Sequence, residues 1–114
     1  IDSGFSGFGE VYFSEVEFNS IKAWKRHKEM TLNLVVPIGK IKFVLYDDRD
    51  ILNCQYQEFT ISRENYYRLT VPPMVWLGFI GLSKNISMLL NIANIGHDPS
   101  EVDRKDINEI KYKW

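Results

Sequence analysis

Residues able to carry out acid–base chemistry are concentrated in one basic segment of the chain. Residues 20–28 read SIKAWKRHK and contain Lys22, Lys25, Arg26, His27 and Lys28. A neutral imidazole is a competent general base near pH 7, and clustered cations can hold an anion such as a diphosphate. The segment therefore predicts a site in which His27 transfers protons beside a bound anion. The alternative is a solvated edge strand whose charges prevent aggregation.

The spacing of these groups limits how many can reach one ligand. In an extended strand Lys22, Trp24 and Arg26 share one face, while Lys25 and His27 share the other. A bulge or a turn is therefore needed before all five basic side chains can converge.

The second histidine, His97, precedes Asp98 and Pro99. Asp98 could orient the imidazole, but an Asp-Pro pair is more typical of a turn, and we favour the turn. Two distant histidines and the single Cys54 are too few for a metal site of the usual kind, so we expect no metal. Cys54 cannot form an intramolecular disulfide and is expected to be an inert thiol.

Aromatic residues suggest a stacking surface for a sugar or a base. The candidates are Trp24, Tyr46, Tyr66, Tyr67 and Trp76, and the alternative is that they form core or interface contacts. Trp76 is the most attractive because it follows the Pro72-Pro73 break, where a strand begins again at a rim.

Composition indicates one globular domain over residues 1–114, and the abrupt start at Ile1 is compatible with a short missing N-terminal segment. The chain is 45% hydrophobic and 14% aromatic, with a formal net charge of −1. No global positive charge attracts nucleic acid, so a nucleic-acid partner is not expected. No apolar run approaches the roughly 20 residues that span a bilayer, and no signal peptide is visible, so we expect no membrane partner and a cytoplasmic protein.

The hydrophobic pattern predicts an all-β protein with eight or nine short strands, a jelly-roll or related barrel. We expect hairpins from residues 31–36 with 40–46 and from 55–62 with 66–71, and we expect 74–80 and 86–92 to be central. The remaining predicted strands are residues 10–18, 20–26 and 107–114.

Several motifs resemble the dTDP-4-dehydrorhamnose 3,5-epimerase family. Residues 64–72, ENYYRLTVP, followed by Gly78-Phe79, resemble its E-N-x-x-x-L-x-[IV]-P … H-G-F stretch. Residues 21–25, IKAWK, lie where the family has I-R-G-L-H, and Asp47 and Arg49 match its D-x-R pair. The resemblance covers nearly the whole chain. It implies a cupin (double-stranded β-helix) fold, a homodimer, and action without cofactor on a nucleotide-linked 4-keto-6-deoxysugar in carbohydrate or lipopolysaccharide biosynthesis.

The resemblance also implies a mechanism, from which this chain departs. In the family a His base removes a proton next to the 4-keto group, a Tyr on the opposite side acts as acid, and a Lys stabilises the enolate. Here the base position holds Lys25, with His27 two residues later. Leu32 replaces the family's Lys, Leu77 the His of H-G-F, and Lys22 a phosphate-binding Arg. Residues 94–97 offer no tyrosine.

Two functions follow. In the first, the chain is a divergent sugar-nucleotide epimerase or isomerase with His27 or Lys25 as base, Lys25 requiring a lowered pKa, and His97 as a candidate acid. In the second, it is a non-catalytic cupin that binds a sugar or nucleotide in polysaccharide biosynthesis. If the chain is an enzyme, we expect His27 to lie inside the barrel beside Tyr46 or Asp47. If it is a non-catalytic cupin, we expect the interior to be filled by Leu32, Leu77 and Trp76. The expected substrate-binding residues are Lys22, Trp24, Arg26, Tyr46, Asp47, Arg49, Trp76 and His97.

Overall fold

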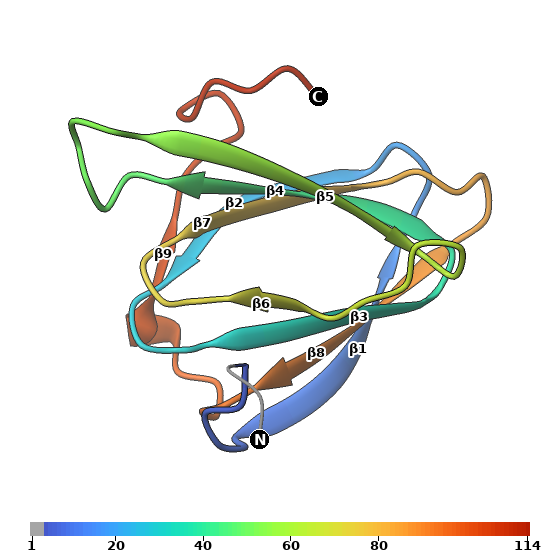
Figure 1. The fold of residues 1–114 in the computed structure, drawn as a ribbon, viewed down its shortest axis with the longest axis horizontal. Helices are drawn as coiled ribbons and strands as arrows, with labels where there is room; N and C mark the ends of the chain where they lie inside the picture. The colour runs from blue at the N-terminus through green and yellow to red at the C-terminus, as the bar shows by residue number, and fades with distance from the viewer. Residues whose placement is uncertain (1–3) are drawn as a thin grey trace.

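The computed structural model describes residues 4–114, which form two antiparallel β-sheets packed face to face (Figure 1). The strands are β1 (Glu10–Val16), β2 (Ile21–His27), β3 (Leu32–Ile38), β4 (Lys40–Asp47), β5 (Gln55–Ser62), β6 (Leu69–Val71), β7 (Trp76–Gly81), β8 (Ser87–Ala93) and β9 (Val102–Arg104). A 3₁₀ turn, η1 (Pro99–Glu101), precedes β9. The predicted all-β cupin barrel is confirmed. In the described residues no helical segment is long and apolar enough to cross a membrane.

Consecutive strands alternate between the two sheets except at β4 and β5, which are neighbours in the same sheet. The four-stranded sheet has the order β1-β8-β3-β6, and the five-stranded sheet has the order β5-β4-β7-β2-β9. β7 and β8 lie inside their sheets, as their apolar sequences predict. Each of these strands has a neighbour on both sides, so its backbone groups are paired without help from solvent.

The predicted hairpins are wrong. β3 pairs with β6 and β8, whereas β4 pairs with β5 and β7, so residues 31–36 and 40–46 belong to different sheets. Gly39, with a φ of +85°, turns the chain from one sheet to the other. β5 and β6 are likewise in different sheets. The actual hairpin joins β4 to β5, from Lys40 opposite Ser62 to Asp47 opposite Gln55. Alternation of apolar residues shows which face is buried, but not which strand is the partner.

The main core fills the space between the sheets. β8 alternates strictly between buried and half-buried residues, and β3 does so from Leu32 to Pro37, because only their inner faces are covered. The fully buried side chains of this core include Leu34, Val36, Ile41, Phe43 and Ile61.

The C-terminal segment covers the outer face of the five-stranded sheet instead of forming the strand predicted for residues 107–114 (Figure 1). Ile110 is buried there against Trp24, Val44 and Trp76, and the Trp24 and Trp114 rings lie 5.4 Å apart. β4 and β7 are therefore apolar on both faces. The segment is held by its side chains and by hydrogen bonds that Trp24 Nε1 and the Tyr56 hydroxyl donate to the carbonyl oxygens of Ile107 and Lys111.

Gly78 in β7 allows this close packing. A Cβ at this position would lie 2.9 Å from the Cζ2 and Cη2 atoms of Trp114 and 2.9 Å from the Cβ of Ala23. We expect Gly78→Ala to lower the free energy of unfolding by about 1–3 kcal/mol, because overpacking forces Trp114 off the sheet. Chemical denaturation and the tryptophan fluorescence maximum measure the two effects. Gly96→Ala, with open space at its Cβ, is the matched control and should cost under about 0.5 kcal/mol. Equal stability of the two variants would contradict this account of the packing.

Candidate functional site

A bulge in β2 brings three of the basic side chains to one face. Lys22 lies opposite Phe79 and Lys25 opposite Leu77, so three steps along β2 match two along β7. The extra residue reverses the alternation, and Lys22 then faces the same side as Lys25 and His27. All three line one cavity. The bulge that the spacing required is present, and it leaves Arg26 on the other face.

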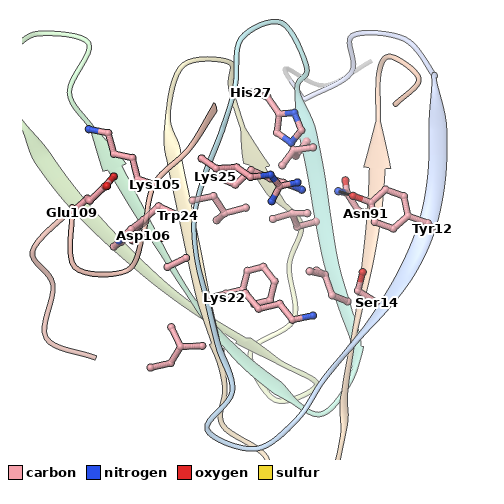
Figure 2. A pocket seen from close by; sticks show the side chains of 18 residues that line it. Tyr12, Ser14, Lys22, Trp24, Lys25, His27, Asn91, Lys105, Asp106 and Glu109 are labelled. Carbon is pink, nitrogen blue, oxygen red and sulfur yellow. Dashed lines mark hydrogen bonds between the residues drawn. The ribbon is translucent and has the colours of Figure 1, made fainter. Parts of the chain in front are cut away.

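The cavity has a volume of about 630 Å³ and extends inward between the two sheets. Its deeper walls are apolar, formed by Leu32, Leu34, Leu77, Phe79 and Leu89. Figure 2 shows Lys22, Lys25 and His27 on one side of this space and Tyr12, Ser14 and Asn91 across from them. A ligand that enters therefore meets basic groups on one wall and neutral polar groups on the other.

His27 is held by a buried carboxylate. Its Nδ1 is hydrogen-bonded to Oε1 of Glu101, and both side chains are almost fully buried. Since the carboxylate accepts from Nδ1–H, the neutral imidazole keeps Nε2 free as a proton acceptor. This is the arrangement of an oriented general base.

Glu101 is itself fixed by its surroundings. Its Oε2 accepts hydrogen bonds from the backbone N–H groups of Glu29 and Met30, each 3.2 Å long. Burial opposes ionisation of Glu101, but the hydrogen bond with His27 and the backbone donors outweigh it and lower the pKa of the carboxyl below its ordinary value. Glu101 is thus an anion at neutral pH.

The turn before β9 places Glu101 beneath β2. Asp98 caps η1 by accepting from the backbone N–H and the hydroxyl of Ser100, at 3.0 and 2.8 Å. The turn predicted at His97-Asp98-Pro99 is therefore present. β9 then pairs with β2, with Val102 opposite His27. A sequence distance of 74 residues between His27 and Glu101 explains why no local pattern indicated the pair.

The basic wall is strongly cationic. Arg104 on β9 lies opposite Lys25 on β2, and both line the cavity with Lys22. Burial lowers the pKa of Lys25, and the charges of Arg104 and Lys22 lower it further, while Glu101 opposes the shift. An anion bound between these cations would offset their mutual repulsion, so this wall favours an anionic ligand.

The opposite wall contains two groups that sequence analysis missed. Tyr12 on β1 and Asn91 on β8 line the cavity, and Asn91 Nδ2 donates to Tyr12 Oη over 2.8 Å. The sequence contains an indication for Asn91, because it is the polar residue within the apolar run 88–93. For Tyr12 the signal was alternation, because Tyr12 and Ser14 share a face of β1 opposite to Val11 and Phe13.

Several predicted binding residues lie outside the cavity. Arg26 is on the other face of β2, where its guanidinium lies 4.6 Å from the Trp76 ring centroid and 2.7 Å from Oδ2 of Asp103. Trp76 and Tyr46 belong to the cluster under the C-terminal segment. Their predicted roles stay predictions, but the fold does not bring them to His27.

Four further candidates also lie away from the basic wall or only at its margin. Asp47, the last residue of β4, pairs over 2.7 Å with Arg49 in the β4–β5 loop, and His97 is exposed. Trp24 reaches the cavity's edge while its indole N–H donates to the carbonyl oxygen of Ile107. The arrangement expected for an enzyme is met only in part, because His27 lies inside the barrel but not beside Tyr46 or Asp47. The filled interior expected for a non-catalytic cupin is not present either, because Leu32 and Leu77 line a cavity that remains open.

The described residues contain no group of three or more His, Cys, Asp or Glu side chains arranged to hold a metal ion.

We expect Glu101→Gln to destabilise the protein in a pH-dependent way. The lowered pKa of Glu101 stabilises the folded state above the carboxyl's ordinary value of 4.5, and this contribution is lost as pH falls through the folded-state pKa. The variant should therefore lose about 1–3 kcal/mol of unfolding free energy at pH 7 and much less at pH 3, as measured by urea denaturation. Glu109→Gln removes an exposed carboxylate and is the control. An equal loss at both pH values would exclude an ionised Glu101 as the stabilising group.

Comparison with known proteins places the chain in a family, although no family model matches it. It is 39% identical to a dTDP sugar isomerase from Desulfovibrio desulfuricans G20, with a TM-score of 0.88, covering 93% of this chain and 69% of that one. A dTDP-4-dehydrorhamnose 3,5-epimerase from Bacillus anthracis, crystallised with TDP and PPi, has a TM-score of 0.82 at 21% identity, covering 95% of this chain and 66% of that one, and shows the shared fold.

A curated relative points the same way. The probable low-salt glycan biosynthesis epimerase Agl13 of Haloferax volcanii is 29% identical over 99 residues, which are 84% of this chain. The chain spans 64% of the length of that relative. The shared barrel, the family motifs and the 39% identity together show that this protein belongs to the dTDP-4-dehydrorhamnose 3,5-epimerase-like family of cupin sugar-nucleotide isomerases and epimerases.

Proposed function

We propose that the protein is a sugar-nucleotide isomerase or epimerase that removes a proton next to the 4-keto group of a nucleotide-linked deoxysugar. The observation that carries the proposal is His27, oriented by Glu101 in the wall of a cavity that also presents Lys25. The relatives support the substrate class, since one is named a dTDP sugar isomerase and another was crystallised with TDP.

His27 is the base in this mechanism. With Nδ1 bound to Glu101, its Nε2 takes the proton from the carbon adjacent to the ketone, and the electron pair of that C–H bond forms an enolate. The carboxylate stabilises the imidazolium that results. His27 can return the proton to the former ketone carbon while the proton of the adjacent hydroxyl passes to the enolate oxygen, and the ketone then moves to the first carbon. Inversion of the first carbon instead needs a proton donor on the opposite face.

The cationic wall stabilises the negative charges of the substrate and of the enolate. Lys25 is next but one to His27 on the same face, so its ammonium group is suited to the enolate oxygen. Lys22 and Arg104 extend the positive charge along the cavity and are suited to the diphosphate. Lys22 contributes charge without the bidentate geometry of an arginine.

The proposal includes action in the cytoplasm on precursors of lipopolysaccharide or another surface glycan. A relative named as a probable glycan biosynthesis epimerase supports the part of this proposal that concerns glycan precursors.

Solvent exchange tests the base. Incubated in D₂O with dTDP-4-keto-6-deoxyglucose, the protein should incorporate deuterium next to the ketone, which proton NMR detects and assigns to a carbon. His27→Asn should slow exchange about 10²- to 10⁴-fold, the usual contribution of a general base. His97→Asn, an exposed imidazole outside the cavity, is the matched control and should exchange normally. Binding without exchange in the unmodified protein would favour the non-catalytic sugar-binding cupin instead.

The proposal also includes a homodimer formed through the outer face of the four-stranded sheet. Val11 and Phe13 on β1 are 50% and 62% exposed, and they lie opposite Ile92 and Leu90 on β8. A contiguous exposed apolar face of this kind is typical of an association surface, and a second copy of the chain is the occupant we propose.

Sedimentation velocity should show a dimer at micromolar concentration. Phe13→Lys should shift the species to monomer, because it places a charge in the centre of the apolar face. Leu52→Lys, at a residue 93% exposed in the β4–β5 loop, should leave the dimer unchanged. A monomer in the unmodified protein would refute this part of the proposal.

A further inference from the structure

We propose that Tyr12 and Asn91 form a specificity element that recognises a ketone together with the hydroxyl group on the adjacent carbon. The inference rests on the proposed function and assigns a part of the substrate to the neutral wall of the cavity. It concerns residues on β1 and β8, outside the basic segment of β2.

A buried polar atom of the cavity wall is unpaired. Asn91 is only 6% exposed, and its Oδ1 is buried without a hydrogen-bond partner among the described residues. Leaving a buried polar atom unpaired costs about 1–3 kcal/mol. Asn91 lines the cavity, and Figure 2 shows its amide directed into the space across from Lys25. A ligand donor is the partner that this atom lacks.

The position of Asn91 makes a purely structural role a poor explanation. It lies in the middle of β8, opposite Tyr12 on β1 and Leu34 on β3. Every other residue of this strand from Met88 to Ile92 is apolar, and the cavity wall around it is formed by leucines. A leucine at this position would fit the wall without the unpaired oxygen.

Tyr12 supplies the complementary group. Its phenol oxygen accepts the hydrogen bond from Asn91 Nδ2, so its own O–H remains available to donate. The pair thus presents one donor and one acceptor side by side. Turning the amide over exchanges the two roles but leaves one donor and one acceptor facing the cavity.

That combination matches an α-hydroxyketone. A ketone oxygen only accepts hydrogen bonds, while the neighbouring hydroxyl can donate one. The Tyr12 O–H would bind the ketone oxygen, and Asn91 Oδ1 would accept from the adjacent hydroxyl. A sugar with a hydroxyl group in place of the ketone can accept from the Tyr12 O–H only when its own hydroxyl proton points away from Tyr12. A ketone accepts this hydrogen bond in any orientation, so the pair fits the ketone better. Because the pair lies across the cavity from His27, it would hold the sugar between the two walls.

Binding measurements test this inference. Calorimetric titrations use dTDP, dTDP-glucose and dTDP-4-keto-6-deoxyglucose, with every protein in the His27→Asn background so that bound ligand is not turned over. Tyr12→Phe and Asn91→Leu should each weaken binding of the keto sugar about tenfold, the effect of losing one hydrogen bond, and should leave dTDP affinity within about twofold. Tyr66→Phe, at an exposed tyrosine outside the cavity, is the control and should change neither.

The outcomes separate this inference from the proposed function. If dTDP binds neither the unmodified protein nor the His27→Asn parent, the proposed function fails and the inference fails with it. If dTDP binds and both wall variants keep the parent's affinity for the keto sugar, the inference alone is overturned. Asn91→Leu should also be at least as stable to urea as its parent, since it removes an unpaired buried oxygen. A less stable variant with unchanged keto-sugar affinity would identify Asn91 as structural. Tyr12→Phe, at a 40% exposed residue, tests the same prediction should Asn91→Leu fail to fold.

Discussion

The buried hydrogen-bonded pair of His27 and Glu101 is the interaction on which the site depends. It joins the end of β2 to the turn before β9, and the same carboxylate binds the backbone of Glu29 and Met30 at the start of the connection to β3. Removing one partner of such a pair leaves a buried polar or charged group unsatisfied, which is far more costly than losing an exposed ion pair. The pair therefore determines both the path of the chain and the tautomer of the imidazole.

The outer faces of the two sheets are covered unequally, and the aromatic cluster lies on the opposite side of β2 from the cavity. The outer face of the five-stranded sheet is covered by the C-terminal segment, which takes Trp24, Trp76 and Tyr46 into an aromatic cluster. The outer face of the four-stranded sheet carries exposed apolar side chains such as Phe13. Aromatic residues that suggest a stacking pocket in the sequence thus serve mainly as packing on the side of β2 away from the cavity.

The two walls of the cavity carry different chemical groups. Lysines and an oriented histidine line one wall, and an asparagine–tyrosine pair lines the other. Leucine side chains between them make the interior apolar, which strengthens electrostatic interactions with any anion that enters. Although Lys25, Leu32 and Leu77 depart from the family motifs, the chain still combines an oriented histidine with a cationic wall. Side chains from β1, β8 and β9 contribute to the same space.

Sequence by itself determined the fold class, the approximate strands and the basic segment, because alternation, turn residues and family motifs are local signals. It also indicated that a bulge was needed for Lys22 to join Lys25 and His27. Strand partners could not be predicted, because period-two alternation in residues 31–36 and 40–46 is equally compatible with a hairpin and with two facing sheets. Only the tertiary structure brought Glu101 to His27 and Tyr12 to Asn91. Those pairs are separated by 74 and 79 residues, and the chain can join them only through the packing of the sheets.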